Sequence, residues 1–191
     1  GGGVLGAGPS TQRIEPHLIR PPGVLDDNLL KKCIRCGECS EVCPTNVIQP
    51  AMLESGLEGF WTPLLIPRIG YCDYSCNACG QICPVGAIPA LSLEEKRETV
   101  IGKAYVDQDR CLAWADREDC IVCEEMCPIP EKAIRLKEAV IEEPDGSLRT
   151  LLQPVVDRER CIGCGICENK CPVSGAAAIR VHTPPLDCLA V

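Results

Sequence analysis

The sequence predicts a small, loop-rich α+β fold whose interior is organised by cysteine side chains rather than by a large apolar core. Three observations indicate this. Of the 191 residues, 17 are cysteine, only 3% are aromatic, and a Cys-Pro step recurs four times along the chain. A chain of this size normally needs more large side chains to fill its interior, so bound metal or disulfides are expected to help hold the fold.

The N-terminal region, residues 1–28, predicts an extended arm. Arg-Pro-Pro-Gly at 20–23 interrupts regular structure, and Asp-Asp-Asn at 26–28 precedes Leu-Leu-Lys-Lys, a pattern typical of a capped helical turn. The chain opens on Gly-Gly-Gly without an initiator methionine. That start fits equally the end of an export signal or anchor helix and a linker.

The main body is expected at residues 29–182, followed by a C-terminal tail at 183–191. Pro-Asp-Gly-Ser at 144–147 is a strong turn signal between the apolar segments 133–142 and 148–156, and it predicts a β-hairpin. Two further segments have clear local patterns: residues 92–100 predict a short charged helix, and residues 50–70 predict a packed loop.

A cysteine-bearing unit occurs four times, each time ending in Cys-Pro followed by a small apolar group. Two units have matching lead-ins, Tyr105–Arg110 and Val155–Arg160, whose short apolar runs predict strands entering a turn. The four units are residues 33–43, 72–83, 111–127 and 161–171.

The first and fourth units have the spacing C-x2-C-x2-C-x3-C-P, the cysteine run of bacterial ferredoxins. The two-residue gaps let three thiolates of one loop reach three corners of one [4Fe–4S] cubane, and the fourth cysteine ligates the other cluster of a pair. The predicted ligands in these units are Cys33, Cys36, Cys39, Cys43, Cys161, Cys164, Cys167 and Cys171.

The second and third units depart from this spacing but keep four cysteines each. The first gap of unit two is one residue longer, which a loop can absorb. Unit three has Trp114 where a second cysteine normally falls, and an insert at 115–119, expected to loop out, precedes Cys120. A four-iron cluster is favoured there, with a three-iron cluster as the alternative if Cys111 does not reach. The predicted ligands are Cys72, Cys76, Cys79, Cys83, Cys111, Cys120, Cys123 and Cys127, so that sixteen cysteines serve four [4Fe–4S] clusters.

Zinc sites and disulfides are the alternative uses of so many cysteines. Neither explains three near ligands plus a remote one, repeated four times. Cys188 is left over and is interpreted as a free or packed thiol. His17 and His182 are isolated, and Trp114 and Tyr74 are expected to shield clusters from water.

Each pair of units predicts one ferredoxin-like β-α-β-β-α-β module, so two 2[4Fe–4S] modules are expected. The spacing leaves two pairings open. Neighbouring units pair, one with two and three with four, or the pairing is nested, one with four and two with three.

Residues 20–23, the Cys-Ile-Arg-Cys-Gly-Glu-Cys run at 33–39 and the order of the spacings resemble a known family. It is that of the four-cluster polyferredoxins of the periplasmic nitrate-reductase and methylamine-utilisation accessory type, related to the iron–sulfur subunits of the DMSO-reductase family. The resemblance covers residues 20–182 and implies nested pairing. The implied ligand sets are Cys33, Cys36, Cys39 and Cys171; Cys161, Cys164, Cys167 and Cys43; Cys72, Cys76, Cys79 and Cys127; and Cys111, Cys120, Cys123 and Cys83.

The net charge and the motifs limit the kinds of partner that we expect for this chain. The formal charge of −8 becomes roughly −16 once four clusters with their thiolates are counted. Nucleic acid needs a basic face and is not expected as a partner, whereas a protein with a basic patch is. No run of about 18 apolar residues occurs, so no transmembrane span is predicted within 1–191. No dinucleotide fingerprint or Ser/His/Asp set is readable, so neither a catalytic site nor a small-molecule substrate is predicted.

The sequence therefore predicts an electron-transfer subunit of an oxidoreductase complex, not an enzyme. The resemblance implies that it relays single electrons between a membrane quinone-linked partner and a catalytic subunit. It also implies a membrane-associated protein on the exported, periplasmic face, with a cytoplasmic location left open. The alternative is a diffusible, soluble polyferredoxin that serves several enzymes. The proline-rich arm favours the first hypothesis, and the acidic charge favours the second.

Overall fold

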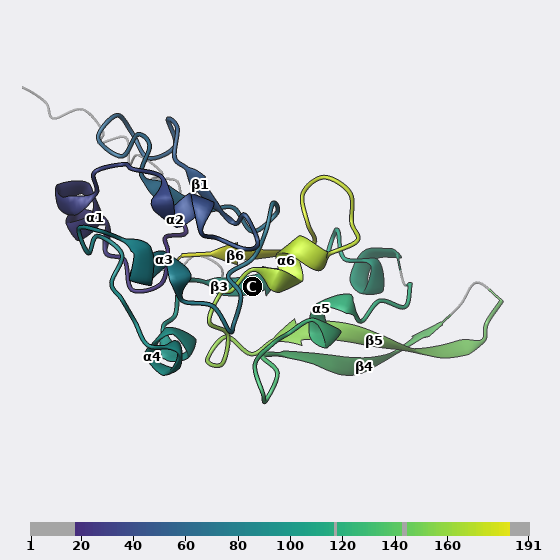
Figure 1. Cartoon of the computed structure of the whole chain (residues 1–191). Coiled ribbons are helices and arrows are strands. Elements are labelled where there is room, and N and C mark those ends of the chain that lie inside the picture. The colour runs from purple at the N-terminus through teal and green to yellow at the C-terminus, as the bar shows by residue number, and fades with distance from the viewer. Residues whose placement is uncertain (1–17, 117, 143–144, 184–191) are drawn as a thin grey trace, which may run out of the picture.

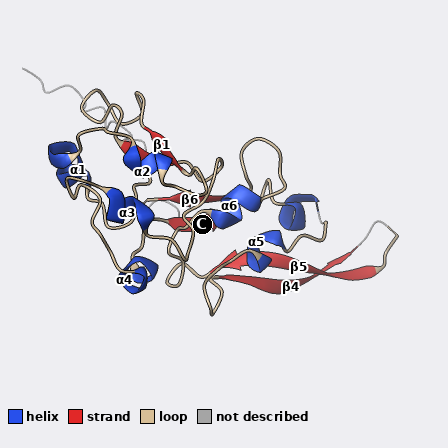
Figure 2. Cartoon of the chain, in the orientation of Figure 1, coloured by secondary structure: helices blue, strands red, loops and turns tan. Residues whose placement is uncertain are grey.

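The computed structural model describes residues 18–116, 118–142 and 145–183, in which short helices and two-stranded sheets are joined by long loops (Figure 1). Figure 2 shows how much of the chain is loop, which confirms the predicted small, loop-rich α+β character. In chain order the elements are α1 (Asp26–Lys32), α2 (Glu38–Glu41), β1 (Ile48–Pro50), β2 (Pro63–Leu65), α3 (Ala78–Ile82), α4 (Leu93–Glu98), β3 (Lys103–Val106), the π-helical turn η1 (Leu112–Asp116), α5 (Val122–Glu125), β4 (Ile134–Glu142), β5 (Leu148–Val156), α6 (Ile166–Lys170) and β6 (Ile179–His182).

The C-terminal half, from β3 to β6, has the β-α-β-β-α-β order expected of a ferredoxin-like module. β3 and β6 are antiparallel, with Lys103 opposite His182, and β4 and β5 form a second antiparallel pair. The β4–β5 ribbon extends away from the rest of the molecule (Figure 1). The predicted hairpin and both predicted lead-in strands are confirmed.

The N-terminal half has only the central hairpin of such a module. β1 and β2 are antiparallel, with Ile48 opposite Leu65, and no outer strand pair flanks them within the described residues 18–102. The expectation of the same strand order in both halves is therefore not met. A helix, α1, leads into unit one where a strand leads into units three and four, and its terminal charges suit the helix dipole. The predicted loop at 50–70 is also corrected, because part of it forms β2.

The described part of the N-terminal arm packs against the body. Arg20 is buried; it pairs with Asp26 at 2.7 Å and donates to the carbonyl oxygen of Pro63 at 2.9 Å. The carbonyl of Ile19 accepts a hydrogen bond from the N–H of Leu65, which extends the edge of the β1–β2 hairpin. The remainder of the arm, residues 1–17, lies outside the described residues.

Both predicted helical segments are present, with one difference. α1 begins at Asp26 after Leu25 as N-cap and has no side-chain cap, so the predicted capping by the acidic run is wrong. α4 begins after Ser92, whose side chain and that of Glu95 form a reciprocal capping box. This box explains why so short and charged a segment is helical.

The core consists of small apolar side chains packed together with cysteines. Val47, Ile134 and Ile179 are buried in one cluster with Cys123 and Cys161, and further cysteines pack against it. This agrees with the expectation that cysteine side chains organise the interior. Within the part of the chain that the structure describes, no helix has the length and hydropathy needed to cross a membrane.

Candidate metal centre

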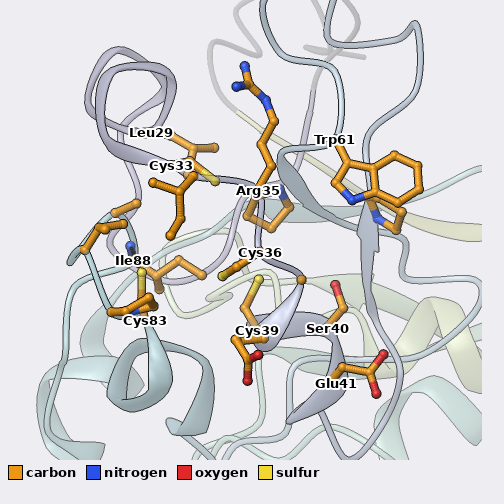
Figure 3. A pocket seen from close by; sticks show the side chains of 18 residues that line it. Leu29, Cys33, Arg35, Cys36, Cys39, Ser40, Glu41, Trp61, Cys83 and Ile88 are labelled. Carbon is orange, nitrogen blue, oxygen red and sulfur yellow. Dashed lines mark hydrogen bonds between the residues drawn. The ribbon is translucent and has the colours of Figure 1, made fainter.

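The first quartet of thiols surrounds a cavity at the end of α1. Cys33 closes the last turn of α1, Cys36 follows on the turn into α2, and Cys39 lies in α2. Gly37 lies between Cys36 and Cys39 with a φ of 85°, a left-handed conformation that glycine adopts without strain and that reverses the chain here. Cys83, from the end of α3, completes the cysteines of the cavity lining (Figure 3). Cys36 is exposed, so this quartet lies at the surface.

The second quartet lines a neighbouring cavity. Cys72, Cys76 and Cys79 of unit two share it with Cys43, the last cysteine of unit one. The hydroxyl oxygen of Thr45 lies 3.5 Å from the sulfur of Cys43. Although burial opposes the effect, this contact and backbone N–H groups lower the pKa of Cys43.

The third and fourth units exchange their last cysteines in the same way. Cys111 packs against Cys171, and after the larger effect of burial the charges of Cys120 and Cys171 raise its pKa. Burial raises the pKa of Cys123 to about 12, with contributions from Cys111 and Cys120. These four side chains therefore form one group.

The remaining quartet is the most buried. Cys161, Cys164 and Cys167 are all buried. Burial raises the pKa of Cys164 to about 12, and the charges of Cys161 and Cys127 add to the rise. Cys127, the last cysteine of unit three, therefore lies close to unit four, and it packs against the buried cluster that contains Cys161 and Cys167.

Two segments of the chain match iron–sulfur families. Residues 116–175 match the 4Fe-4S dicluster domain, and residues 30–49 match the 4Fe-4S binding domain. The methylamine utilization ferredoxin-type protein MauM of Methylorubrum extorquens is 35% identical over 90% of this chain and 76% of its own length. The ferredoxin-type protein NapG of Escherichia coli is 33% identical over 94% of this chain and 77% of its own length. The chain belongs to this family of ferredoxin-type proteins.

Membership confirms the resemblance to the nitrate-reductase and methylamine-utilisation accessory ferredoxins, whereas the expected relation to the DMSO-reductase subunits stays a prediction. Membership makes the chain a ferredoxin-type 4Fe-4S electron-transfer protein. The ferredoxin-type protein NapF of E. coli is also similar, at 31% identity over 86% of each chain. The dicluster match covers units three and four from within the insert of unit three, which agrees with the paired strands found there.

The thiols of this ferredoxin-type chain are not grouped as the nested pairing expects. That scheme places Cys171 with unit one and Cys83 with unit three. Instead Cys83 lines the cavity of unit one, and Cys171 packs beside Cys111. Strand pairing explains the difference. β3–β6 and β4–β5 bring units three and four together, and β1–β2 joins units one and two.

Within each half the two quartets are close enough to influence each other. After burial and the charge of Cys72, Cys39 of unit one raises the pKa of Cys79 in unit two, which reaches about 12. In the same way Cys123 of unit three contributes to the raised pKa of Cys167 in unit four.

The two halves meet between units two and four. The N–H of Cys72 donates to the carbonyl of Cys164 at 2.8 Å. The guanidinium of Arg68 donates to three backbone carbonyls of the opposite half, at 3.1, 3.1 and 2.6 Å. Those carbonyls belong to Glu168, Cys171 and Val173. The quartets therefore follow one another in the order unit one, unit two, unit four, unit three.

The electrostatics of the quartets suit a positively charged core. Burial, followed by the neighbouring thiols, raises the pKa of Cys39 to about 11 and that of Cys79 to about 12. Such thiols stay protonated at neutral pH unless cations bind among them, because thiolate ligation releases the protons. Iron in a [4Fe–4S] core supplies this charge, so these residues fit the group.

The quartets differ from a site for a single ion. Among the described residues, no three His, Cys, Asp or Glu side chains converge on a point where one ion could bind. A cubane makes a different demand, since each of its four thiolates binds its own iron.

The insert of unit three is more regular than predicted. Its first part lies in the π-helical turn η1, in which the N–H of Ala115 donates to the carbonyl of Cys111 at 2.7 Å. The indole N–H of Trp114 donates to the carbonyl of Pro154 in β5 at 3.2 Å, and its side chain packs against the small buried cluster that contains Cys111. This position is compatible with the predicted shielding role.

The other residues singled out from the sequence are placed as follows. The ring of His182 lies 4.5 Å from that of Tyr105, measured between centroids. The guanidinium of Arg97 lies 4.9 Å above the ring of Tyr74. Cys188 and His17 lie outside the described residues. The role of Arg68 was not predicted, because a single arginine in a loop carries no periodic pattern.

Proposed function

We propose that the chain carries four [4Fe–4S] clusters, paired between neighbouring units, and passes single electrons along them in the order unit one, unit two, unit four, unit three. The proposed ligand sets are Cys33, Cys36, Cys39 and Cys83; Cys72, Cys76, Cys79 and Cys43; Cys161, Cys164, Cys167 and Cys127; and Cys111, Cys120, Cys123 and Cys171.

The observation that carries this proposal is the succession of thiol quartets from one end of the molecule to the other. Each quartet has a neighbour close enough to affect its thiols or to hydrogen-bond to its backbone. The role of such a protein is to fix the spacing of the clusters and to set their potentials through burial, charge and hydrogen bonds. No catalytic group is needed for that role.

The unit-one end of the relay is apolar and faces solvent. Leu57 and Leu53 are 84% and 73% exposed, and Ile34 and Trp61 of the cavity wall are exposed as well. Exposed apolar groups near one another indicate an interaction site. We assign this end to a membrane quinone-linked partner with an apolar surface, which would place the chain in a membrane-associated complex on the exported face.

The unit-three end is acidic and is assigned to a catalytic oxidoreductase subunit with a basic patch. Glu118 and Glu125 are exposed within unit three, and Asp119 pairs with Arg149 at 3.6 Å. Complementary charge at such a surface raises the rate of association and selects the partner.

The second candidate function is a diffusible polyferredoxin that serves several enzymes. The acidic composition supports it, because a formal charge of −8 favours solubility and transient docking. It does not account for the apolar side chains at the unit-one end.

Anaerobic purification of the native protein in mild detergent, with mass spectrometry of its companions, tests the proposal. A membrane subunit and a catalytic subunit in fixed ratio, retained after a salt wash, are the expected result. A chain that arrives alone would overturn the fixed relay and favour the diffusible carrier.

A further inference from the structure

One lysine of the charged helix α4 is buried. Lys96 is only 3% exposed, whereas Glu95 and Glu98 of the same helix are exposed. Its ammonium group donates to the carbonyl oxygen of Asp73, the residue that follows the unit-two ligand Cys72. Of the lysines in the described part of the chain, it is the one that is buried.

This buried ammonium has no carboxylate partner among the described residues. Every ion pair found there joins other side chains. Moving a charged group from water into a protein interior costs on the order of several kcal/mol even after the protein relaxes around it. Buried lysines are therefore normally paired with an anion. The position of Lys96 therefore calls for an anion beside it, and the thiolate of Cys72, the neighbour of Asp73 in the chain, can supply one.

We propose that Lys96 is the counter-ion of the unit-two cluster and raises the reduction potential of that cluster. The inference rests on the proposed function, since it needs iron and sulfide held by Cys72 and its three partners. Lys96 binds no iron; it acts through the ligand beside it.

The direction of the effect follows from charge. A one-electron reduction takes a [4Fe–4S] core from 2+ to 1+, with the electron coming from the donor protein or, in the assay, from dithionite, and no proton need be taken up. The reduced cluster with its thiolates carries one more negative charge. A fixed positive charge in a poorly solvated position stabilises that form more than the oxidised form.

The thiol chemistry of Cys72 is consistent with this arrangement. Burial raises the pKa of Cys72, and the charge and hydrogen bonding of Lys96 act against that rise. Lys103 differs from Lys96 in being only half-buried, and its ammonium group donates to the backbone carbonyl of Cys161 at 2.8 Å.

The test is an EPR-monitored redox titration of the full chain, reconstituted anaerobically, for wild type, Lys96→Met and the control Arg97→Met. Lys96→Met removes the charge at nearly constant volume. The control removes a second cation of α4, Arg97, whose guanidinium lies over the ring of Tyr74 and donates to the carbonyl of Tyr74. In K96M one of the four cluster potentials should fall, with at least a tenfold loss in the equilibrium constant for reduction, which is about 59 mV for one electron. Equal potentials in K96M and wild type, or an equal fall in R97M, would overturn the proposal.

Two further results keep the test decisive. If K96M loses iron, Lys96→Arg, which keeps the charge, should retain the full iron content, and iron loss in both variants would refute a role for charge. Iron and sulfide assays on the wild type separate the two proposals. A wild type without clusters refutes the proposed function, whereas four clusters with unchanged potentials refute the role of Lys96 alone.

Discussion

Replacing Arg68 by alanine tests how the two halves of the protein are held together. Its guanidinium donates three hydrogen bonds to backbone carbonyls across the junction between units two and four. A hydrogen bond to a charged group contributes about 1.5–3 kcal/mol. Because Arg68 is half-buried and water will solvate part of the freed carbonyls, we expect R68A to lose about 2–4 kcal/mol in total.

The assay is the bleaching of the visible cluster absorbance on heating, under anaerobic conditions and at a fixed scan rate. For a chain of this size each kcal/mol shifts the midpoint by about 2–4 °C, so R68A should bleach roughly 4–16 °C below wild type. The matched control is Arg110→Ala, since Arg110 also donates to backbone carbonyls, including that of Ala176 at 2.9 Å, but is exposed and acts within one half. Equal midpoints for R68A and R110A would refute the idea that Arg68 joins the halves.

Three other predictions follow from single features. Gly165→Ala should lower iron content and bleaching temperature more than Gly37→Ala: both glycines have left-handed φ, but a Cβ at 165 meets Pro67 at 2.8 Å and one at 37 meets nothing within 4 Å. Equal losses of iron and of bleaching temperature in the two variants would show that the left-handed backbone, and not the contact with Pro67, causes the damage. Trp114→Ala removes a ring that packs against the buried cluster containing Cys111, together with its hydrogen bond to Pro154. It should shorten the lifetime of one iron–sulfur cluster in air several-fold, measured as loss of its EPR signal, and an unchanged lifetime would exclude a shielding role. Chelation of iron under reducing conditions should abolish most of the near-ultraviolet circular dichroism and the cooperative unfolding transition, because few large apolar side chains are buried. An unfolding transition that survives chelation would show that the fold does not depend on metal.

Local patterns predicted most of the individual elements. The turn signal at 144–147 between two apolar runs predicted the β4–β5 hairpin, and the charged segment 92–100 predicted the helix α4. Cysteine spacing predicted that the first three thiols of a unit would lie together, and those of units one and two each line one cavity.

The long-range arrangement was not predictable in the same way. The pairing of the units depends on which strands associate. β3 and β6 pair although about seventy residues separate them in the chain, and such long-range contacts leave no local pattern. The resemblance carried the nested pairing over from a different group of proteins, whereas the strand pairing here joins neighbours. The prediction for the N-terminal half was more regular than the structure, because α1 and the arm take the place of the outer strands.

Lys96 shows a second limit of sequence reasoning. Within Leu-Glu-Glu-Lys-Arg-Glu it looks like one more exposed charge, and only the packing of α4 against the unit-two loop reveals that it is buried. Long-range hydrogen bonds such as those of Arg68 leave no pattern in the sequence either.

The most direct test of the account is the iron content of two double variants of the reconstituted chain. C33A/C83A removes two ligands of one proposed cluster, whereas C33A/C171A removes one ligand from each of two. Wild type should bind about 16 iron atoms per chain, and C33A/C83A about 12 with no EPR signal of three-iron clusters. C33A/C171A should damage two clusters, leaving about 14 iron atoms with a strong three-iron signal, or about 8 if both clusters are lost. If C33A/C171A instead kept about 12 iron atoms without a three-iron signal, and C33A/C83A showed the damage to two clusters, the pairing of neighbouring units would be contradicted. A wild-type iron content near zero would contradict the clusters themselves.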